Sequence, residues 1–195
     1  MSSQNAKVSR LNRLKWRLMR AVGMERAAWD QQHRAGMWEF EDKSPHLIEH
    51  VTTLAKGGDI LEFGCGDGRL VDFLPDGAFA TYLGSDISPA TVALCQSRLG
   101  RDNVAFEPAD MTTWTAPDRT FDLILLEECI YYLTPPQITR FLAECRQCLA
   151  PGGHLLVVIH SETKHRATVD HLEKMLHVSD RRTCDGRLYL TLQPD

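Results

Sequence analysis

The spacing of apolar residues changes near residue 58, which divides the chain into two parts. In the first part, five apolar residues recur at spacings of three and four among basic residues, which predicts an amphipathic helix. They are Val8, Leu11, Leu14, Leu18 and Val22. A further helix is expected to begin at Ser44-Pro45, with serine as N-cap and proline at the first helical position, and to end at Gly57-Gly58. Residues 1–57 are therefore predicted to form an N-terminal helical segment.

From residue 59 onward, short apolar runs alternate with segments of helical pattern, which is typical of a parallel sheet with helices on both faces. The expected strands are 60–63, 80–84, 104–106, 121–126 and 155–159. Four helices are expected. The first follows the glycine-rich turn and ends at Leu74, the second begins at Ser88-Pro89, the third runs from Thr134-Pro135 to Pro151, and the fourth covers about 166–177. The run 121–126 is apolar enough to be a central strand that is buried on both faces.

The last part of the chain has a different pattern. Two short strand-like pieces flank Cys184-Asp185-Gly186, and Asp-Gly predicts a type I′ hairpin, so these two strands should be antiparallel. The whole pattern predicts a Rossmann-like, doubly wound α/β fold. Its seven-stranded sheet would be mostly parallel with a C-terminal antiparallel hairpin, formed by residues 58–195 and preceded by the N-terminal helices.

Composition and charge narrow the function classes. A chain of 195 residues with 43% hydrophobic residues can bury the core of one domain, and no apolar run approaches the length of a membrane span. The first 24 residues carry six basic side chains and no acidic one, so a net charge of −4 leaves an acidic body. An acidic body argues against nucleic acid as the main partner.

Cysteine and histidine usage argues against a metal site. The six cysteines are scattered and several fall in expected core elements, which favours reduced thiols in a cytoplasmic protein. Cys145 and Cys148 form a CxxC pair, but no second pair completes a zinc site, and the eight histidines show no HExxH spacing.

A glycine-rich turn is the most informative feature of the sequence. Gly64, Gly66 and Gly68 follow a strand and open a helix, so the backbone can turn sharply and lie close to a ligand. Asp86 follows 18 residues after Gly68, at the end of the second strand, where a carboxylate can accept hydrogen bonds from ribose hydroxyls.

The charge of this turn separates two cofactor classes. Glu62 and Asp67 would repel the pyrophosphate that a dinucleotide places at such a helix N-terminus. They suit S-adenosylmethionine, which has no phosphate and carries a sulfonium and an ammonium group. A nicotinamide-dependent reductase is the competing reading, and the acidic turn weighs against it.

Five motifs together resemble a known family. The run Glu-Phe-Gly-Cys-Gly-Asp-Gly at 62–68 resembles the first motif of class I S-adenosylmethionine-dependent methyltransferases. Four further motifs follow in the family's order, over about residues 58–160. They are Gly84-Ser85-Asp86-Ile87-Ser88, Pro108-Ala109-Asp110-Met111, Phe121-Asp122-Leu123-Ile124 and Leu149-Ala150-Pro151-Gly152-Gly153.

The resemblance implies a set of cofactor-binding residues. They are Glu62, Gly64, Cys65, Gly66, Gly68, Asp86, Ile87, Asp110, Met111 and Glu127. Glu62 and the glycines would hold the methionine end, and Asp86 the ribose. Ile87 would pack on the adenine, whose amino group would donate to Asp110 beside the backbone of Met111, and Glu127 would lie near the methionine end or the substrate.

Catalytic candidates are expected at the carboxyl ends of the fourth and fifth strands, where ligands bind in open α/β sheets. A hydroxyl acceptor needs a general base, whereas a neutral amine needs little beyond orientation. Glu128 and His160 are the candidates, with Tyr131 as a wall or hydrogen-bond partner. Each has a structural alternative: Glu128 could cap the following loop, His160 could end a strand at the surface, and Tyr131 could be a packing residue. Lys164 and His165 are expected to be a solvated helix start.

The predicted function is methyl transfer from S-adenosylmethionine, with S-adenosylhomocysteine as product, to O or N of a small molecule or sugar-containing metabolite. Two stretches, 127–133 and the upstream Trp29…Trp38, resemble small bacterial methyltransferases that act on such acceptors. A non-catalytic S-adenosylmethionine-binding module is a further alternative. Residues 25–57 are predicted to be a lid, with Trp29 or Trp38 closing the pocket. Residues 1–24 fit a helix in weak peripheral contact with a membrane or a partner, a transit peptide, or a solvated helix.

Overall fold

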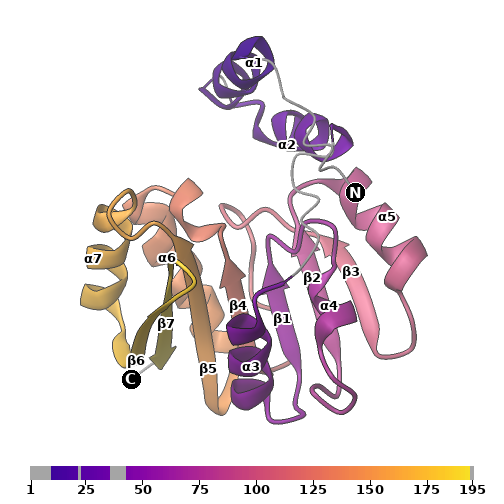
Figure 1. The fold of residues 1–195 in the computed structure, drawn as a ribbon, viewed down its shortest axis with the longest axis vertical. Helices are drawn as coiled ribbons and strands as arrows, with labels where there is room; N and C mark the ends of the chain where they lie inside the picture. The colour runs from indigo at the N-terminus through magenta and orange to yellow at the C-terminus, as the bar shows by residue number, and fades with distance from the viewer. Residues whose placement is uncertain (1–9, 22, 36–42, 194–195) are drawn as a thin grey trace.

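The computed structural model describes residues 10–21, 23–35 and 43–193, which contain one seven-stranded sheet (Figure 1). The strands are β1 (Ile60–Phe63), β2 (Tyr82–Asp86), β3 (Val104–Pro108), β4 (Phe121–Glu127), β5 (Leu149–His160), β6 (His177–Cys184) and β7 (Arg187–Gln193). Their order is β3-β2-β1-β4-β5-β7-β6, with the first five parallel and β7 antiparallel to both neighbours. The predicted seven-stranded doubly wound fold is confirmed.

The helices flank the sheet or lie beyond one end of it. They are α1 (Arg10–Ala21), α2 (Glu25–Arg34), α3 (Pro45–Ala55), α4 (Leu70–Phe73), α5 (Pro89–Leu99), the 3₁₀ turn η1 (Ile130–Tyr132), α6 (Pro135–Cys148) and α7 (Arg166–Met175). Helix α3 buries Leu47, Val51 and Ala55 in the core beside the sheet. Helices α1 and α2 instead lie together at the end of the sheet (Figure 1). Val8, Val22 and Trp38 lie outside the described residues.

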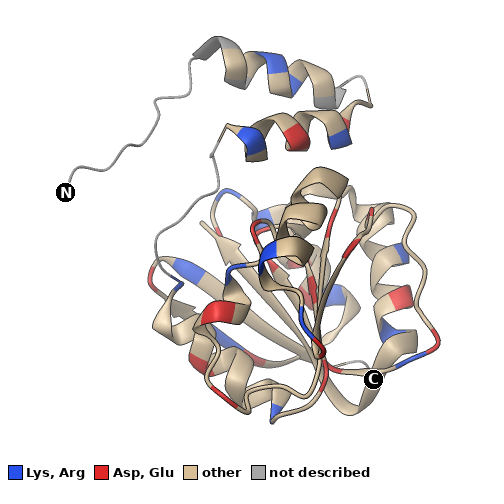
Figure 2. Cartoon of the chain, turned by 90° about the vertical axis from the view of Figure 1, so that its right-hand side faces the viewer, with Lys and Arg blue, Asp and Glu red and all other residues tan. Residues whose placement is uncertain are grey.

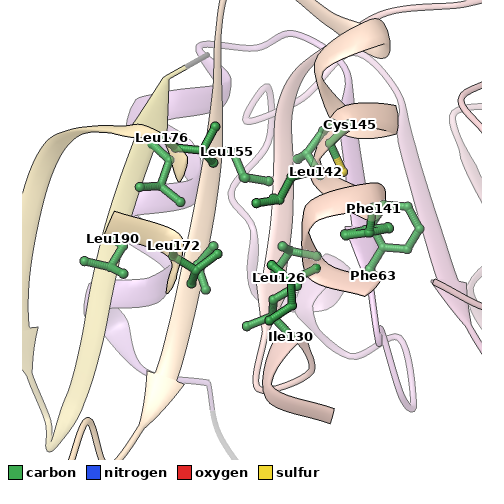
Figure 3. Close-up of a cluster of buried hydrophobic side chains, with 14 of the residues drawn as sticks. Phe63, Leu126, Ile130, Phe141, Leu142, Cys145, Leu155, Leu172, Leu176 and Leu190 are labelled. Atoms are coloured by element: carbon green, nitrogen blue, oxygen red, sulfur yellow. The ribbon is translucent and has the colours of Figure 1, made fainter. Parts of the chain in front are cut away.

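Strand β4 carries the two halves of the core. Its side chains alternate, so that Leu123 and Leu125 join the cluster with α3 and α5, whereas Ile124 and Leu126 join the cluster with α6 and α7. All four are fully buried, which confirms the prediction of a central strand covered on both faces. Figure 3 shows part of the α6–α7 side, where Phe63 of β1 lies against Phe141 of α6.

Local signals gave several boundaries correctly. Ser88 caps α5 by accepting a hydrogen bond from the Thr91 amide, and Thr134 forms a capping box with Gln137 at the start of α6. Asp185 and Gly186 have φ angles of 53° and 73°, as a type I′ hairpin turn requires.

Other expectations need correction. Ser44 precedes α3 but makes no side-chain cap; its hydroxyl donates instead to Asp185 of the hairpin turn at 2.7 Å, a contact that no local pattern reveals. The helix expected through Leu74 is one turn long. Strand β5 begins at Leu149, because Leu149 pairs with Phe121 before a register shift in the ladder.

All six cysteines are free thiols, and five of them are buried. Cys145 and Cys148 lie within α6 and its apolar core, which favours packing over metal binding. Within the described ranges, no three or more His, Cys, Asp and Glu side chains gather as metal ligands would. In the same ranges, no helix has the length and apolarity needed to cross a bilayer.

Close packing at β2 generates a stability prediction. A Cβ atom at Gly84 would lie 2.6 Å from Cδ1 of Phe106 and 3.2 Å from Sγ of Cys65. Gly84→Ala should therefore lower the free energy of unfolding by about 1–3 kcal/mol, measured by urea denaturation. Adding Phe106→Leu should relieve the clash and give a coupling energy of about 0.5–3 kcal/mol. If the two substitutions changed the free energy of unfolding additively, contact with the Phe106 ring would not be the cause of the Gly84→Ala destabilisation.

Candidate active site

The glycine turn joins β1 to α4 and is held against the end of β2. Gly64, Gly66 and Gly68 have φ angles of 69°, 54° and 70°, which glycine adopts without strain. The Gly66 amide donates to Oδ2 of Asp86 at 3.2 Å, and the Cys65 amide donates to the Ser85 carbonyl at 3.0 Å. The turn thus lies beside the carboxylate that the sequence assigns to a ribose.

Asp86 is buried and surrounded by donors. Its Oδ1 accepts from the Ser88 amide at 2.9 Å, and Nε2 of His33 lies 3.9 Å from the same oxygen. Burial raises the pKa of Asp86, while His33 and the amides of Ser88 and Gly66 oppose that rise. The backbone contacts hold the carboxylate at the turn.

Helix α2 lies over this part of the site. The Ser88 hydroxyl donates to Asp30, and Cε1 of His33 would be 3.8 Å from a Cβ atom at Gly66. Helix α3, in contrast, packs beside the sheet. The lid role predicted for residues 25–57 stays a prediction, and α2 is the part of that range positioned for it.

The third strand ends beside the second. The Ala109 amide donates to the Asp86 carbonyl at 2.9 Å, which brings the loop with Asp110 next to the ribose candidate. Oδ1 of Asp110 accepts from the amide and the hydroxyl of Thr112 at 2.9 and 2.7 Å. Ile87 and Met111 are half-buried. The adenine roles given to these residues are not tested by this geometry and stay predictions.

Two carboxylates form an acidic centre at the ends of β1 and β4. Glu62 is 1% exposed and accepts a hydrogen bond from the Tyr82 hydroxyl. Glu127 accepts from the Lys43 ammonium at 2.6 Å and lies 3.7 Å from the Arg187 guanidinium. Burial raises the pKa of Glu62 to about 7, with Lys43 opposing and Glu127 adding to the rise.

Lys43 is a site residue that the sequence did not predict. Burial lowers its pKa, but the carboxylates of Glu127 and Glu62 more than compensate, and the pKa of Lys43 is raised overall. Lys43 lies 84 residues before Glu127 and belongs to none of the five motifs. Only its place shortly after the Trp29…Trp38 stretch hinted that this segment approaches the site.

Glu128 and Tyr131 are brought together just after the end of β4. Glu128 has a φ of 58°, unusual for a residue with a side chain, and its amide donates to the Val158 carbonyl of β5 at 3.0 Å. The Tyr131 hydroxyl donates to Oε2 of Glu128 at 2.9 Å. Oε1 of Glu128 is buried and has no hydrogen-bond partner among the described residues.

Aromatic rings extend this side of the site. The His165 ring stacks on Tyr131 with centroids 3.8 Å apart, and Trp29 of α2 meets Tyr132 edge-on at 4.9 Å. His165 is the N-cap residue of α7, so the expected helix start is confirmed, but the residue is only partly exposed because Tyr131 covers one face of its ring. Burial, followed by Lys164 and His160, lowers the pKa of His165.

His160 is placed differently from the other two catalytic candidates. It is exposed at the end of β5, where it pairs in register with Arg187 of β7. No hydrogen bond within the described part of the chain joins it to Glu128 or Tyr131. Its catalytic role stays a prediction, with less geometric support than that of Glu128.

The buried Glu62 generates a pH-dependent stability prediction. Its pKa lies near 7 in the folded chain against an ordinary value of 4.5, so the folded state holds the proton more tightly. This group's contribution is fully present below pH 4.5 and is lost as pH rises through about 7, a difference of about 3 kcal/mol. Glu62→Gln should not show that loss, as measured by urea denaturation from pH 5 to 8.

Lys43→Met provides the companion variant. Removing the cation should move the Glu62 step in the stability profile to higher pH, since Lys43 lowers that pKa. An unmoved step would show that Lys43 does not act on Glu62.

Comparisons with known proteins identify a methyltransferase domain in this chain. Residues 60–153 match the model of a methyltransferase domain. A phthiotriol/phenolphthiotriol dimycocerosates methyltransferase of Mycobacterium leprae is 35% identical over 100 residues, which are 51% of this chain and 36% of the relative. A 2-heptyl-1-hydroxyquinolin-4(1H)-one methyltransferase of Mycobacteroides abscessus is 22% identical over 68% of this chain and 60% of its own length. The matches thus span less than two thirds of either relative.

A solved structure shows the same fold. The N-methyltransferase NodS from Bradyrhizobium japonicum WM9, in complex with S-adenosyl-L-homocysteine, superposes with a TM-score of 0.67 at 20% identity. The superposition covers 85% of this chain and 98% of that one. Residues 60–153 thus match a methyltransferase domain, and the described chain has the fold of the NodS structure; over this region the chain resembles the class I S-adenosylmethionine-dependent methyltransferases.

Proposed function

We propose that this chain transfers a methyl group from S-adenosylmethionine to an oxygen or nitrogen atom of a small molecule or sugar-containing metabolite. The observation that carries the proposal is the set of carboxylates at the ends of adjacent strands around the glycine turn. They are Glu62, Asp86, Asp110 and Glu127. Such a set suits a cofactor with two cationic groups, because opposite charges attract strongly where water is excluded.

The same charges disfavour the nicotinamide alternative. Glu62 is buried directly before the turn and Asp67 lies within it, so a pyrophosphate there would meet carboxylates instead of open amides. The Gly66 amide, moreover, already donates to Asp86.

In this proposal Glu128 is the general base toward the acceptor. The cofactor supplies a methyl group on a cationic sulfur atom, which leaves with the electron pair of the breaking bond. The acceptor atom forms the new bond and loses its proton. Oε1 of Glu128 is available to take that proton, because the Tyr131 hydroxyl donates to Oε2. For an amine acceptor the same carboxylate would orient the N–H group.

The aromatic side chains favour an acceptor with an apolar surface next to its nucleophile. Tyr131 bonds to Glu128 and contacts the rings of Tyr132 and His165, and Tyr132 in turn meets Trp29. Relatives named for phthiotriol dimycocerosates and for a hydroxyquinolinone fit an acceptor hydroxyl on an apolar molecule. NodS is named as an N-methyltransferase, so the proposal covers both atoms.

The free buried cysteines fit a cytoplasmic location as part of the proposal.

Cofactor binding is tested with Asp86→Ala. The variant should lower S-adenosylmethionine affinity by about tenfold or more, since hydrogen bonds to a charged acceptor contribute about 1.5–3 kcal/mol each. Calorimetric titration with S-adenosylmethionine, S-adenosylhomocysteine and NAD in parallel measures this. Asp118→Ala, at an exposed carboxylate away from the site, is the matched control and should bind as the unaltered chain does.

The titration has two contrary outcomes. Binding of NAD alone would overturn the methyltransferase proposal. Equal affinities of the Asp86→Ala variant and the unaltered chain, with both folded by circular dichroism, would remove Asp86 from the ribose site.

Turnover is tested with Glu128→Gln. Once an acceptor panel identifies a substrate, the variant should lower kcat by about 100- to 10,000-fold for a hydroxyl acceptor, with little change in cofactor affinity. Tyr131→Phe, which keeps the ring, should lower kcat less. Glu107→Gln, an exposed carboxylate on β3, serves as control. Full activity of the Glu128→Gln variant would exclude a base role, and cofactor binding without turnover on any acceptor would favour a non-catalytic module.

A further inference from the structure

Helix α1 presents an apolar face that is more than half exposed. Leu14 and Leu18 lie one turn apart and are 52% and 59% exposed, among the most exposed large apolar side chains in the described residues. Residues four apart lie on the same side of a helix, so the two leucines form one continuous apolar strip. Each exposed leucine forgoes free energy that burial against an apolar partner would supply.

The opposite side of α1 is fixed to the protein. Trp16 is only 4% exposed, and α1 packs against α2 after a short turn in which the Met24 amide donates to the Met19 carbonyl at 2.9 Å. Helix α2 in turn contacts the start of α5 through the hydrogen bond from Ser88 to Asp30. The leucine strip therefore faces outward from a helix that is anchored on its other side.

Basic side chains accompany the strip. Lys15 and Arg17 are exposed on the same helix, and α1 contains no acidic residue (Figure 2). The chain as a whole has a net charge of −4, so this positive charge is a local feature. Leucines flanked by exposed Lys and Arg match a lipid surface, where the apolar side chains enter the acyl boundary and the cations meet phosphate groups.

We propose that α1, through Leu14 and Leu18 flanked by Lys15 and Arg17, docks the protein on an anionic lipid bilayer. The surface lies on the same side of the molecule as the candidate active site, because α1 rests on α2 and α2 contacts the site through Trp29 and Tyr132. Docking would turn the end of the sheet that carries the candidate active site toward the bilayer, with α1 and α2 between the two (Figure 1). Membrane binding itself does not depend on the proposed methyl transfer.

The test is co-sedimentation of the full chain with vesicles. The chain should bind vesicles of phosphatidylcholine mixed with phosphatidylglycerol, and bind pure phosphatidylcholine vesicles far less. Lys15→Gln combined with Arg17→Gln should lower the partition coefficient by about tenfold or more, since each cation near an anionic surface contributes about 1 kcal/mol. High salt should lower binding of the unaltered chain in the same way.

The leucines are tested with a matched control. Leu14→Ser combined with Leu18→Ser should remove most of the vesicle binding, whereas Leu94→Ser, at a leucine of α5 that is 58% exposed, should not. Calorimetric titration with S-adenosylmethionine should give the same affinity for these variants, which shows that the fold is intact and separates this proposal from the cofactor assignment.

Three outcomes would overturn the proposal. The first is no binding to anionic vesicles, and the second is an equal loss of binding in the Leu94→Ser control. The third is a concentration-dependent dimer, seen by light scattering, that the double leucine variant abolishes while vesicles do not bind. That result would assign the strip to a second copy of the chain.

Discussion

The site depends on burying the carboxylate of Glu62 beneath the glycine turn. An isolated buried charge is costly, and the surrounding groups are arranged to offset that cost. Tyr82, from the neighbouring strand, donates to Glu62, and Lys43 approaches from the segment before α3. The buried carboxylate at the end of β1 thus draws Lys43 to the centre of the sheet. An apolar side chain at position 62 would need neither the Tyr82 hydrogen bond nor the Lys43 charge.

The end of β4 divides the site into two sides. Glu127 completes the strand and pairs with Lys43 and Arg187, which makes one side of the site ionic. The next residue, Glu128, adopts a left-handed backbone conformation and bonds to Tyr131, which makes the other side aromatic. Consecutive glutamates therefore serve opposite sides, because the backbone changes direction between them. Strain of this kind is often found where a fold serves a site.

Local features of the fold could be predicted from the sequence, whereas contacts between residues far apart in the chain could not. The strands, the Asp185-Gly186 turn and the glycine turn follow from short patterns, because period, φ preference and capping act over a few residues. Ser44, Lys43 and His165 could not be placed in this way. The Ser44 hydroxyl bonds to Asp185 instead of capping α3, and Lys43 pairs with a carboxylate 84 residues later. The His165 ring stacks on Tyr131. Each of these contacts exists only once the sheet has assembled.

The strand order also has a consequence for synthesis on the ribosome. Strand β7 lies between β5 and β6, although it is made after both. Until β7 emerges, the apolar edge of β5 over residues 155–160 has unpaired amides and carbonyls, and β6 has no strand to join. An exposed edge of this kind pairs readily with other chains, so the nascent protein passes through an aggregation-prone stage. The tight Asp185-Gly186 turn shortens that stage, because it lets β6 and β7 pair as a hairpin and close the edge in one step.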